Sequence, residues 1–226
     1  MRRTLIVILA FVICVPLSAQ QTTQPPAQPA DPPIDANMLW KALLTGNQKF
    51  DSGEIEYNDL DGEQKKLENG QMPPITILAC SDSRVPPELI FNQSLGALFV
   101  IRTAGSVADD LGLASIEYAI KFGWTSLIVV LGHENCGAVH SSLNPDDPVT
   151  PSLLKLAQRI RSSFYGLPYT PDDEAVVEKA VQANTRASAA WLTAHSIVVR
   201  KAVIDGKIKI VPAYYSLETG LVREIK

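Results

Sequence analysis

The chain has 226 residues, of which 46% are hydrophobic and 19% are charged, and its 20 basic and 24 acidic residues give a formal net charge of −4. That length suits one well-buried domain and is short for two. A negative net charge without a basic block argues against a protein that binds nucleic acid by neutralising its phosphates. Three cysteines in so long a chain also exclude a small domain stapled by disulfides.

The first 19 residues have the pattern of an export signal. Arg2 and Arg3 form a positively charged start, residues 5–15 are all apolar, and Ala19 supplies a small residue at the expected cleavage point. The apolar run is too short to cross a bilayer as a helix; the alternative interpretation is an N-terminal anchor that is not cleaved. We predict a signal peptide over residues 1–19, export to a bacterial periplasm and no stable membrane insertion after processing.

A change of composition marks the start of the folded domain. Residues 20–34 are rich in proline and glutamine, and they predict a linker without a core of its own. Apolar residues then return at helical spacing, which predicts a helix from Asp35 that ends at Gly53. A second, shorter helix is expected over residues 61–67. We predict that one domain occupies residues 35–226 and that these helices form its N-terminal arm.

The rest of the domain alternates between short apolar runs and amphipathic segments. The apolar runs have the length and β-branched content of buried strands, and they lie at residues 75–79, 98–101 and 127–131. Helical periodicity predicts a helix through residues 113–120 that ends near Gly123, one after Pro151, and one that runs to about Ile204 with a break near His195. The Thr-Pro-Asp-Asp run at residues 170–173 is typical of the start of that last helix. Residues 208–215 and 221–225 predict a closing hairpin.

Strands that alternate with helices indicate an α/β fold with a parallel-core β-sheet flanked by helices, here with an N-terminal helical arm and a C-terminal hairpin. In such a sheet, ligands bind beyond the carboxyl ends of the strands. Cys80 ends the first predicted strand, and His133 and Cys136 follow the third. We therefore expect these three side chains to meet, although they are far apart in the sequence.

Two thiolates and an imidazole are typical zinc ligands. Three protein ligands leave a fourth position open to water, which is the pattern of a catalytic site rather than a structural one. The alternative is a disulfide between Cys80 and Cys136, with His133 as an ordinary loop residue. Asp82 and Arg84 favour the metal, because side chains two residues apart leave a strand end on the same side; by themselves they would form a surface ion pair.

The runs CSDSR at residues 80–84 and HENCG at residues 133–137 resemble the paired signature of the β-class carbonic anhydrases. The similarity extends over roughly residues 39–218. The resemblance implies that Cys80, His133 and Cys136 bind one Zn²⁺ per chain, with water or hydroxide as the fourth ligand. It also implies that Asp82 accepts a hydrogen bond from the zinc-bound hydroxide and that Arg84 holds Asp82 charged and away from the metal.

The same resemblance implies a substrate site. Gln71 matches a glutamine that donates a hydrogen bond to the substrate, often across a dimer interface. Phe99, Ala104 and Tyr118 match residues that line a small apolar pocket, and the Gly137 N–H is placed to hold bicarbonate. Without the resemblance, Phe99 and Tyr118 would be interpreted as core residues. The family also implies a homodimer or a dimer-based tetramer.

The function that we predict is the reversible hydration of CO₂ to bicarbonate and a proton by metal-bound hydroxide, the reaction of a zinc-dependent carbonate dehydratase. One alternative is the hydrolysis of a related heterocumulene, CS₂ or COS, on the same fold. Another is a non-catalytic zinc or redox protein. Ala97, Thr103 and Ser106 depart from residues common in the family, and Ile77 stands where one subclass has a tryptophan that builds an inhibitory bicarbonate site. Ile77 therefore predicts a permanently open, water-bound form.

Overall fold

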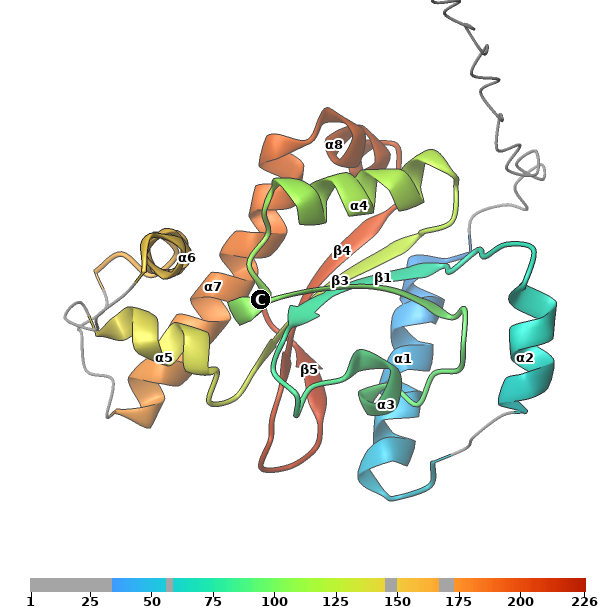
Figure 1. Cartoon of the computed structure of the whole chain (residues 1–226), viewed down its shortest axis with the longest axis horizontal. Helices are drawn as coiled ribbons and strands as arrows, with labels where there is room; N and C mark the ends of the chain where they lie inside the picture. The colour runs from blue at the N-terminus through green and yellow to red at the C-terminus, as the bar shows by residue number, and fades with distance from the viewer. Residues whose placement is uncertain (1–33, 56–58, 145–149, 167–172) are drawn as a thin grey trace, which may run out of the picture.

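Five strands pair into one sheet in the order β2-β1-β3-β4-β5 (Figure 1). The computed structural model describes residues 34–55, 59–144, 150–166 and 173–226. The predicted signal peptide and the predicted linker, apart from Ile34, lie outside the described residues. No helix in the described part of the chain is both long enough and apolar enough to cross a membrane.

The first four strands are parallel, and the fifth is antiparallel to its neighbour. The strands are β1 (Ile75–Cys80), β2 (Leu98–Thr103), β3 (Leu127–His133), β4 (Lys209–Tyr215) and β5 (Val222–Glu224). The helices are α1 (Ala36–Asp51), α2 (Leu60–Leu67), α3 (Pro87–Ile90), α4 (Asp110–Lys121), α5 (Gly137–Leu143), α6 (Pro151–Arg161), α7 (Glu174–His195) and α8 (Ile197–Ile204), and a 3₁₀ turn, η1 (Ala104–Ser106), follows β2. The predicted α/β fold with a parallel core is confirmed, and so is the closing hairpin.

The start of the long helix was predicted wrongly. Helix α7 begins at Glu174 and not near Thr170, because Asp173 is its N-cap. The Asp173 carboxylate accepts hydrogen bonds from the N–H groups of Ala175 and Val176 at 3.0 and 3.3 Å. An acidic side chain that takes two of the unpaired N–H groups fixes the first turn more directly than a proline does. The predicted break near His195 is confirmed, since α7 ends there and α8 begins at Ile197.

The central strands are buried on both faces, which explains why their sequences are apolar without alternation. Every residue of β1 and β3 is buried. Successive side chains point to opposite faces, so Ile77 and Val129 join a core that includes residues of α1, while Leu78 and Val130 join a core under α4 and α8. Figure 1 shows α1 on one side of the sheet and α4 and α8 on the other.

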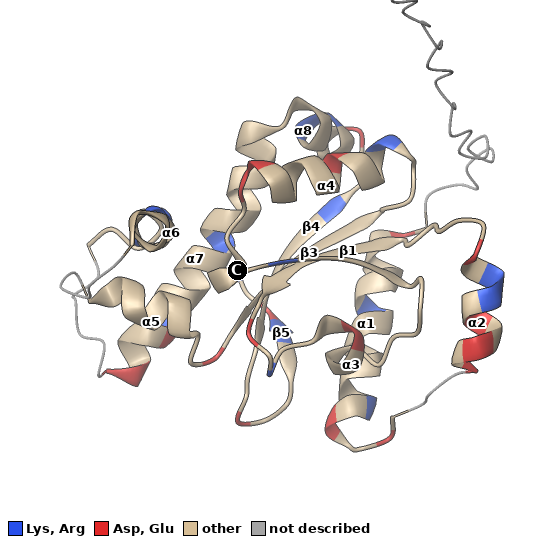
Figure 2. Cartoon of the chain, in the orientation of Figure 1, with Lys and Arg blue, Asp and Glu red and all other residues tan. Residues whose placement is uncertain are grey.

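Charged residues of both signs are spread over the helices, as Figure 2 shows. In α2 they are ordered along the axis: Asp61 and Glu63 lie in the first turn, and Lys65 and Lys66 lie in the last. This order places each charge at the end of the helix dipole of opposite sign. Helix α2 has no buried residue, so these favourable charges compensate for an absent apolar face.

The buried side chain of Asn47 connects α1 to the rest of the fold by hydrogen bonds. Asn47 is 1% exposed, and its Nδ2 donates hydrogen bonds to the main-chain oxygens of Ile90 at 3.2 Å and Gly220 at 2.9 Å. Its Oδ1 accepts a third hydrogen bond from the N–H of Val222 at 2.7 Å. One side chain therefore connects α1 both to the end of α3 and to the hairpin that carries β5.

We expect Asn47→Ala to lower the free energy of unfolding by about 3 kcal/mol, because each lost hydrogen bond contributes about 1 kcal/mol and buried main-chain groups are left unpaired. Urea unfolding at fixed protein concentration measures the change. Thr45→Ala is the control: Thr45 is an exposed residue of the same helix, bonded only to Lys41 of its own helix among the hydrogen bonds described, and its loss should change stability by about 0.5 kcal/mol or less. Equal unfolding midpoints for the two variants would contradict the role of Asn47.

Candidate metal centre

Three potential metal ligands lie together at the carboxyl ends of neighbouring strands. Cys80 is the last residue of β1, His133 is the last residue of β3, and Cys136 is the N-cap residue of α5. Their ligand atoms all lie within 4.8 Å of one another, and all three residues are buried. Because β1 and β3 are adjacent and parallel, their carboxyl ends reach the same edge of the sheet. The structure thus brings together the three residues that the sequence analysis proposed as ligands.

His133 turns one ring nitrogen toward the two sulfurs. Its Nδ1 lies 2.8 Å from the main-chain oxygen of Glu134, so Nδ1 carries the proton and donates. That tautomer leaves a lone pair on Nε2, which is buried and has no hydrogen-bond partner among the described residues. Such unpartnered buried atoms are rare in native proteins. A histidine oriented by a carbonyl through its other nitrogen is typical of a metal ligand.

The two sulfurs complete a zinc-like donor set. Cys80 and Cys136 are both free cysteines with their Sγ atoms 3.9 Å apart. A hydrogen bond from the Cys136 thiol, with smaller contributions that include the Asp82 and Gly105 N–H groups, lowers the pKa of Cys80 to about 4. The same S–H···S contact, together with burial, raises the pKa of Cys136. A divalent cation placed between the sulfurs would replace the proton they share and hold both as thiolates. Two thiolates and an imidazole fit zinc.

A clamped carboxylate stands beside these ligands. Arg84 Nε donates to Asp82 Oδ1 at 3.0 Å and its second guanidinium nitrogen donates to Oδ2 at 2.8 Å, a bidentate pair. These hydrogen bonds hold the pKa of Asp82 well below its usual range. Asp82 Oδ2 lies 4.0 Å from His133 Nε2, so the negative charge faces the metal-binding atoms. Arg84 also donates to the main-chain oxygen of Asn135 at 3.2 Å, which ties the two ligand loops together.

Arg102 holds the first ligand loop from the neighbouring strand. Its Nε donates to the main-chain oxygen of Cys80 at 2.9 Å, and a terminal nitrogen donates to the main-chain oxygen of Asp82. The sequence analysis did not identify this role. The available signal was an arginine inside the apolar strand β2, in register with Ala79 and therefore next to the first ligand.

Glu134 holds the second ligand loop. Its Oε2 accepts hydrogen bonds from Ser216 Oγ at 2.8 Å and from the N–H of Glu218 at 2.9 Å. The main-chain hydrogen bond from Glu218, followed by the one from Ser216, lowers the pKa of Glu134. The residue that accepts the His133 Nδ1 proton on its main chain is thereby anchored to the turn after β4. Sequence reasoning also missed this contact, because it joins segments 82 residues apart.

Two of the five residues predicted to bind substrate lie near the ligands. Ala104 begins η1, directly after Thr103, whose partner in the sheet is Cys80. Gly137 is the first residue of α5 and follows Cys136.

The other three lie toward the opposite end of the sheet. Phe99 pairs with Thr76 near the start of β1, and a rise of about 3.3 Å per residue places Phe99 about 13 Å along β2 from Thr103. The rings of Phe99 and Tyr118 both pack edge-on against Trp124, at 6.0 and 5.4 Å between centroids. Gln71 is exposed and precedes the first residue of β1. Within one chain, these three side chains do not meet the three candidate ligands.

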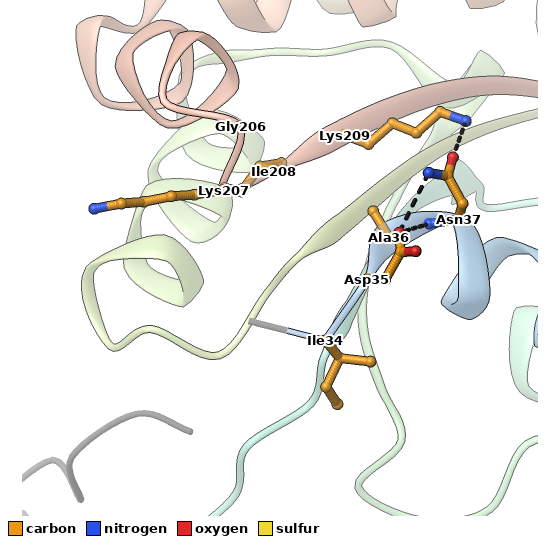
Figure 3. A pocket seen from close by; sticks show the side chains of 8 residues that line it. All are labelled: Ile34, Asp35, Ala36, Asn37, Gly206, Lys207, Ile208 and Lys209. Carbon is orange, nitrogen blue, oxygen red and sulfur yellow. Dashed lines mark hydrogen bonds between the residues drawn. The ribbon is translucent and has the colours of Figure 1, made fainter. Parts of the chain in front are cut away.

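The described residues also line two surface hollows, of which the second includes Glu134, the residue after His133. One is at the start of α1, where Lys209 of β4 donates to Asn37 and Asp35 accepts the cap hydrogen bond (Figure 3). The other lies between α7 and the hairpin, beside Tyr214 and Arg223. Neither hollow is lined by a cysteine or a histidine, so the metal chemistry belongs to the strand ends.

Comparisons with known proteins lead to one family. The profile of the family described as "Carbonic anhydrase" matches residues 75–222. Carbonic anhydrase 2 of Mycobacterium tuberculosis is 37% identical over 185 residues, which cover 80% of this chain and 88% of that protein. The carbonic anhydrase of Mycolicibacterium smegmatis is 35% identical over 192 residues, which cover 81% of this chain and 90% of that one.

Solved structures extend the likeness to the fold. The β-carbonic anhydrase CcaA has a TM-score of 0.67 and 26% identity, with 84% of this chain and 88% of that chain covered. The Coccomyxa β-carbonic anhydrase, solved in complex with acetazolamide, has a TM-score of 0.62 and 25% identity, with coverage of 84% and 83%. A tetrameric β-carbonic anhydrase of Sordaria macrospora has a TM-score of 0.67 and 24% identity, with coverage of 84% and 97%.

We expect the purified protein to carry about one zinc per chain and Cys136→Ala to carry about a tenth of that or less, because the loss of one of three ligands leaves an incomplete site. Metal analysis after dialysis measures the content, and His195→Ala, at the end of α7, should retain the full amount. Thiol titration after chelation should find both Cys80 and Cys136 reduced. A protein without zinc in which these two cysteines form a disulfide would contradict the assignment.

Proposed function

The chain belongs to the carbonic anhydrase family, and on that premise we propose that it hydrates CO₂ reversibly to bicarbonate and a proton. It is a β-class zinc enzyme, like the solved structures to which it is similar. One observation carries the proposal: Cys80, His133 and Cys136 converge within 4.8 Å beside a carboxylate that Arg84 keeps ionised. A disulfide between Cys80 and Cys136 would not require that carboxylate.

Zinc bound by these three residues supplies an acidified water, which is the nucleophile that CO₂ hydration requires. Two thiolates offset the charge of a dication, so this ligand set acidifies water less than neutral ligands do. Hydrogen bonds from the chain's own residues therefore contribute more to activating the nucleophile. The ionised Asp82 is the acceptor that faces the ligand atoms.

Asp82 and Arg84 act as a unit that orients the nucleophile. Because the pKa of Asp82 is lowered, its carboxylate can accept but not donate a hydrogen bond at neutral pH. Arg84 occupies both carboxylate oxygens, which stops the group from turning to coordinate the metal. Arg102 fixes the main chain of the same loop. A carboxylate held in this way would orient a metal-bound nucleophile before the reaction begins.

We expect Asp82→Asn to lower kcat for CO₂ hydration about 100-fold while zinc stays bound, because the amide donates where the carboxylate accepts. Stopped-flow measurement with a pH indicator gives the rate, and metal analysis gives the zinc content. Asp109→Asn is the matched control: Asp109 caps α4 through the N–H of Gly112, and asparagine caps equally well. An unchanged kcat in Asp82→Asn, or turnover of COS or CS₂ without CO₂ hydration, would contradict the proposal.

We propose that a second copy of the chain completes the substrate pocket. Gln71, Phe99 and Tyr118 lie away from the ligands of their own chain, and Tyr118 is 39% exposed. The edge strand β2 is apolar over residues 98–101, yet those residues are only partly covered, and such an edge favours association. A twofold axis that crosses the β2 strands sets the amino end of one beside the carboxyl end of the other. Phe99 of each copy would then approach the metal centre of its partner.

Mixed dimers test this arrangement. We expect Gln71→Ala and Asp82→Asn, each impaired alone, to regain about a quarter of the wild-type activity when co-expressed in equal amounts, because half the dimers then contain one intact site. Stopped-flow assays of the purified mixture give the activity. Asp82→Asn mixed with Arg84→Ala should show no gain, since both changes affect the same loop. A mixture no more active than the mean of its two parents would contradict the shared site.

The proposal includes the place where the enzyme works. Residues 1–19 carry the pattern of an export signal, and residues 20–34 that of a linker. We propose that the signal is removed and that the enzyme acts in a bacterial periplasm.

A further inference from the structure

A buried amide on helix α7 reaches the turn that contacts the first zinc ligand. Asn184 is 3% exposed, and its Nδ2 donates to the main-chain oxygen of Gly105 at 2.7 Å. The two residues are 79 positions apart in the chain. On the other side of its Cα, Gly105 donates its N–H to Cys80 Sγ at 3.3 Å. A single residue, Gly105, therefore connects Asn184 with Cys80. Asn184 itself is neither a metal ligand nor part of the Asp82–Arg84 pair.

The turn between them does not hold its shape through local preference. Gly105 has a φ of 69°, and Ser106 has a φ of 54°, which non-glycine residues seldom adopt. Such a conformation persists where surrounding groups determine it. Three side-chain hydrogen bonds do so here: Asn184 donates to the Gly105 oxygen, Ser106 Oγ donates to the main-chain oxygen of Leu131 at 2.6 Å, and Thr103 Oγ1 donates to the main-chain oxygen of Val107 at 2.7 Å. Of these, only the bond from Asn184 is made to Gly105 itself. Without Asn184, the Gly105 oxygen loses that partner, and the orientation of Gly105 is fixed less firmly.

The Gly105 N–H matters because hydrogen bonds to a thiolate withdraw electron density from the sulfur. A less electron-rich sulfur donates less charge to zinc, which is one way in which outer groups tune a metal. The Cys80 sulfur accepts a second hydrogen bond, from the N–H of Asp82 at 3.4 Å. That donor is only two residues along the chain, so the end of β1 determines its position. The Gly105 donor comes from another segment of the chain, so its position depends on what holds that segment.

We infer that Asn184 is a positioning residue of the zinc site, which sets the Gly105 N–H···Sγ hydrogen bond to Cys80 and through it the charge that this sulfur donates. The effect on rate rests on the proposed function. The hydrogen bond itself is independent of any reaction, and it is measured without substrate.

Metal substitution makes the bond observable. In protein loaded with ¹¹³Cd, the Gly105 amide proton should show a scalar coupling to the metal, transmitted through the N–H···S bond. In Asn184→Leu, which keeps the size of the side chain but removes its donor, we expect that coupling to disappear. In cobalt-loaded Asn184→Leu and Asn184→Asp, the sulfur-to-metal charge-transfer band should shift to longer wavelength, because the Cys80 thiolate is more electron-rich.

A control separates this effect from a general loss of stability. Thr125 is buried, and its hydroxyl pairs with that of Thr76 at the amino end of β1, so Thr125→Val also removes a buried hydrogen bond but lies far along the strand from Cys80. We expect Thr125→Val to lower the unfolding midpoint and to leave the cobalt band and the cadmium coupling unchanged. We expect the Asn184 variants to lower kcat/KM about 10-fold, because a more electron-rich sulfur makes the metal a weaker Lewis acid.

Two results would overturn the inference. The first is a wild-type protein whose Gly105 amide shows no coupling to ¹¹³Cd, a measurement that needs no variant to fold. The second is an Asn184→Leu or Asn184→Asp protein whose coupling and cobalt band match those of the wild type. A protein that shows the coupling but does not hydrate CO₂ would refute the proposed function and leave the role of Asn184 intact.

Discussion

The parallel pairing of β1 with β3 determines where the three candidate metal ligands lie. The register that sets Ala79 beside Leu131 brings Cys80 and His133 to the same edge of the sheet, and the turn into α5 adds Cys136. Both strands are buried on both faces, so neither can shift by a residue without moving its apolar side chains to the wrong core. The hydrophobic core therefore sets the geometry of the metal centre.

Burial also makes the unpaired polar atoms of the metal centre energetically costly. Two thiols and an unpartnered imidazole nitrogen lie in the interior, where polar groups without partners are costly. Zinc satisfies all three at once. Hydrogen bonds from outside the ligand set surround them: Arg84 holds Asp82, Arg102 of β2 holds the main chain of Cys80, and the turn at Gly105 donates to the Cys80 sulfur. These contacts leave the ligands little freedom, which is what a preorganised site requires.

Much of this was predictable from the sequence because it depends on local patterns. Continuous apolar runs located the buried strands to within about two residues, and a Cys, a His and a Cys that follow strands in a parallel sheet lead to one edge. The start of α7 differs from the prediction because the cap is Asp173, the last residue of the predicted run. The parts played by Arg102 and Asn184 could not be found, since each depends on a hydrogen bond between distant segments. The distance between Phe99 and the ligands could be found only from the register of the strands.

Cys80, His133 and Cys136 are proposed to hold the zinc ion that makes this protein a catalyst of CO₂ hydration. Stopped-flow CO₂ hydration by the protein lacking residues 1–19 tests this proposal most directly, before chelation, after chelation and after one equivalent of zinc is returned. We expect catalysis to be lost when the metal is removed and restored when it is returned. Zinc-loaded protein that is inactive from about pH 7 to 9, or activity that survives complete removal of the metal, would contradict it.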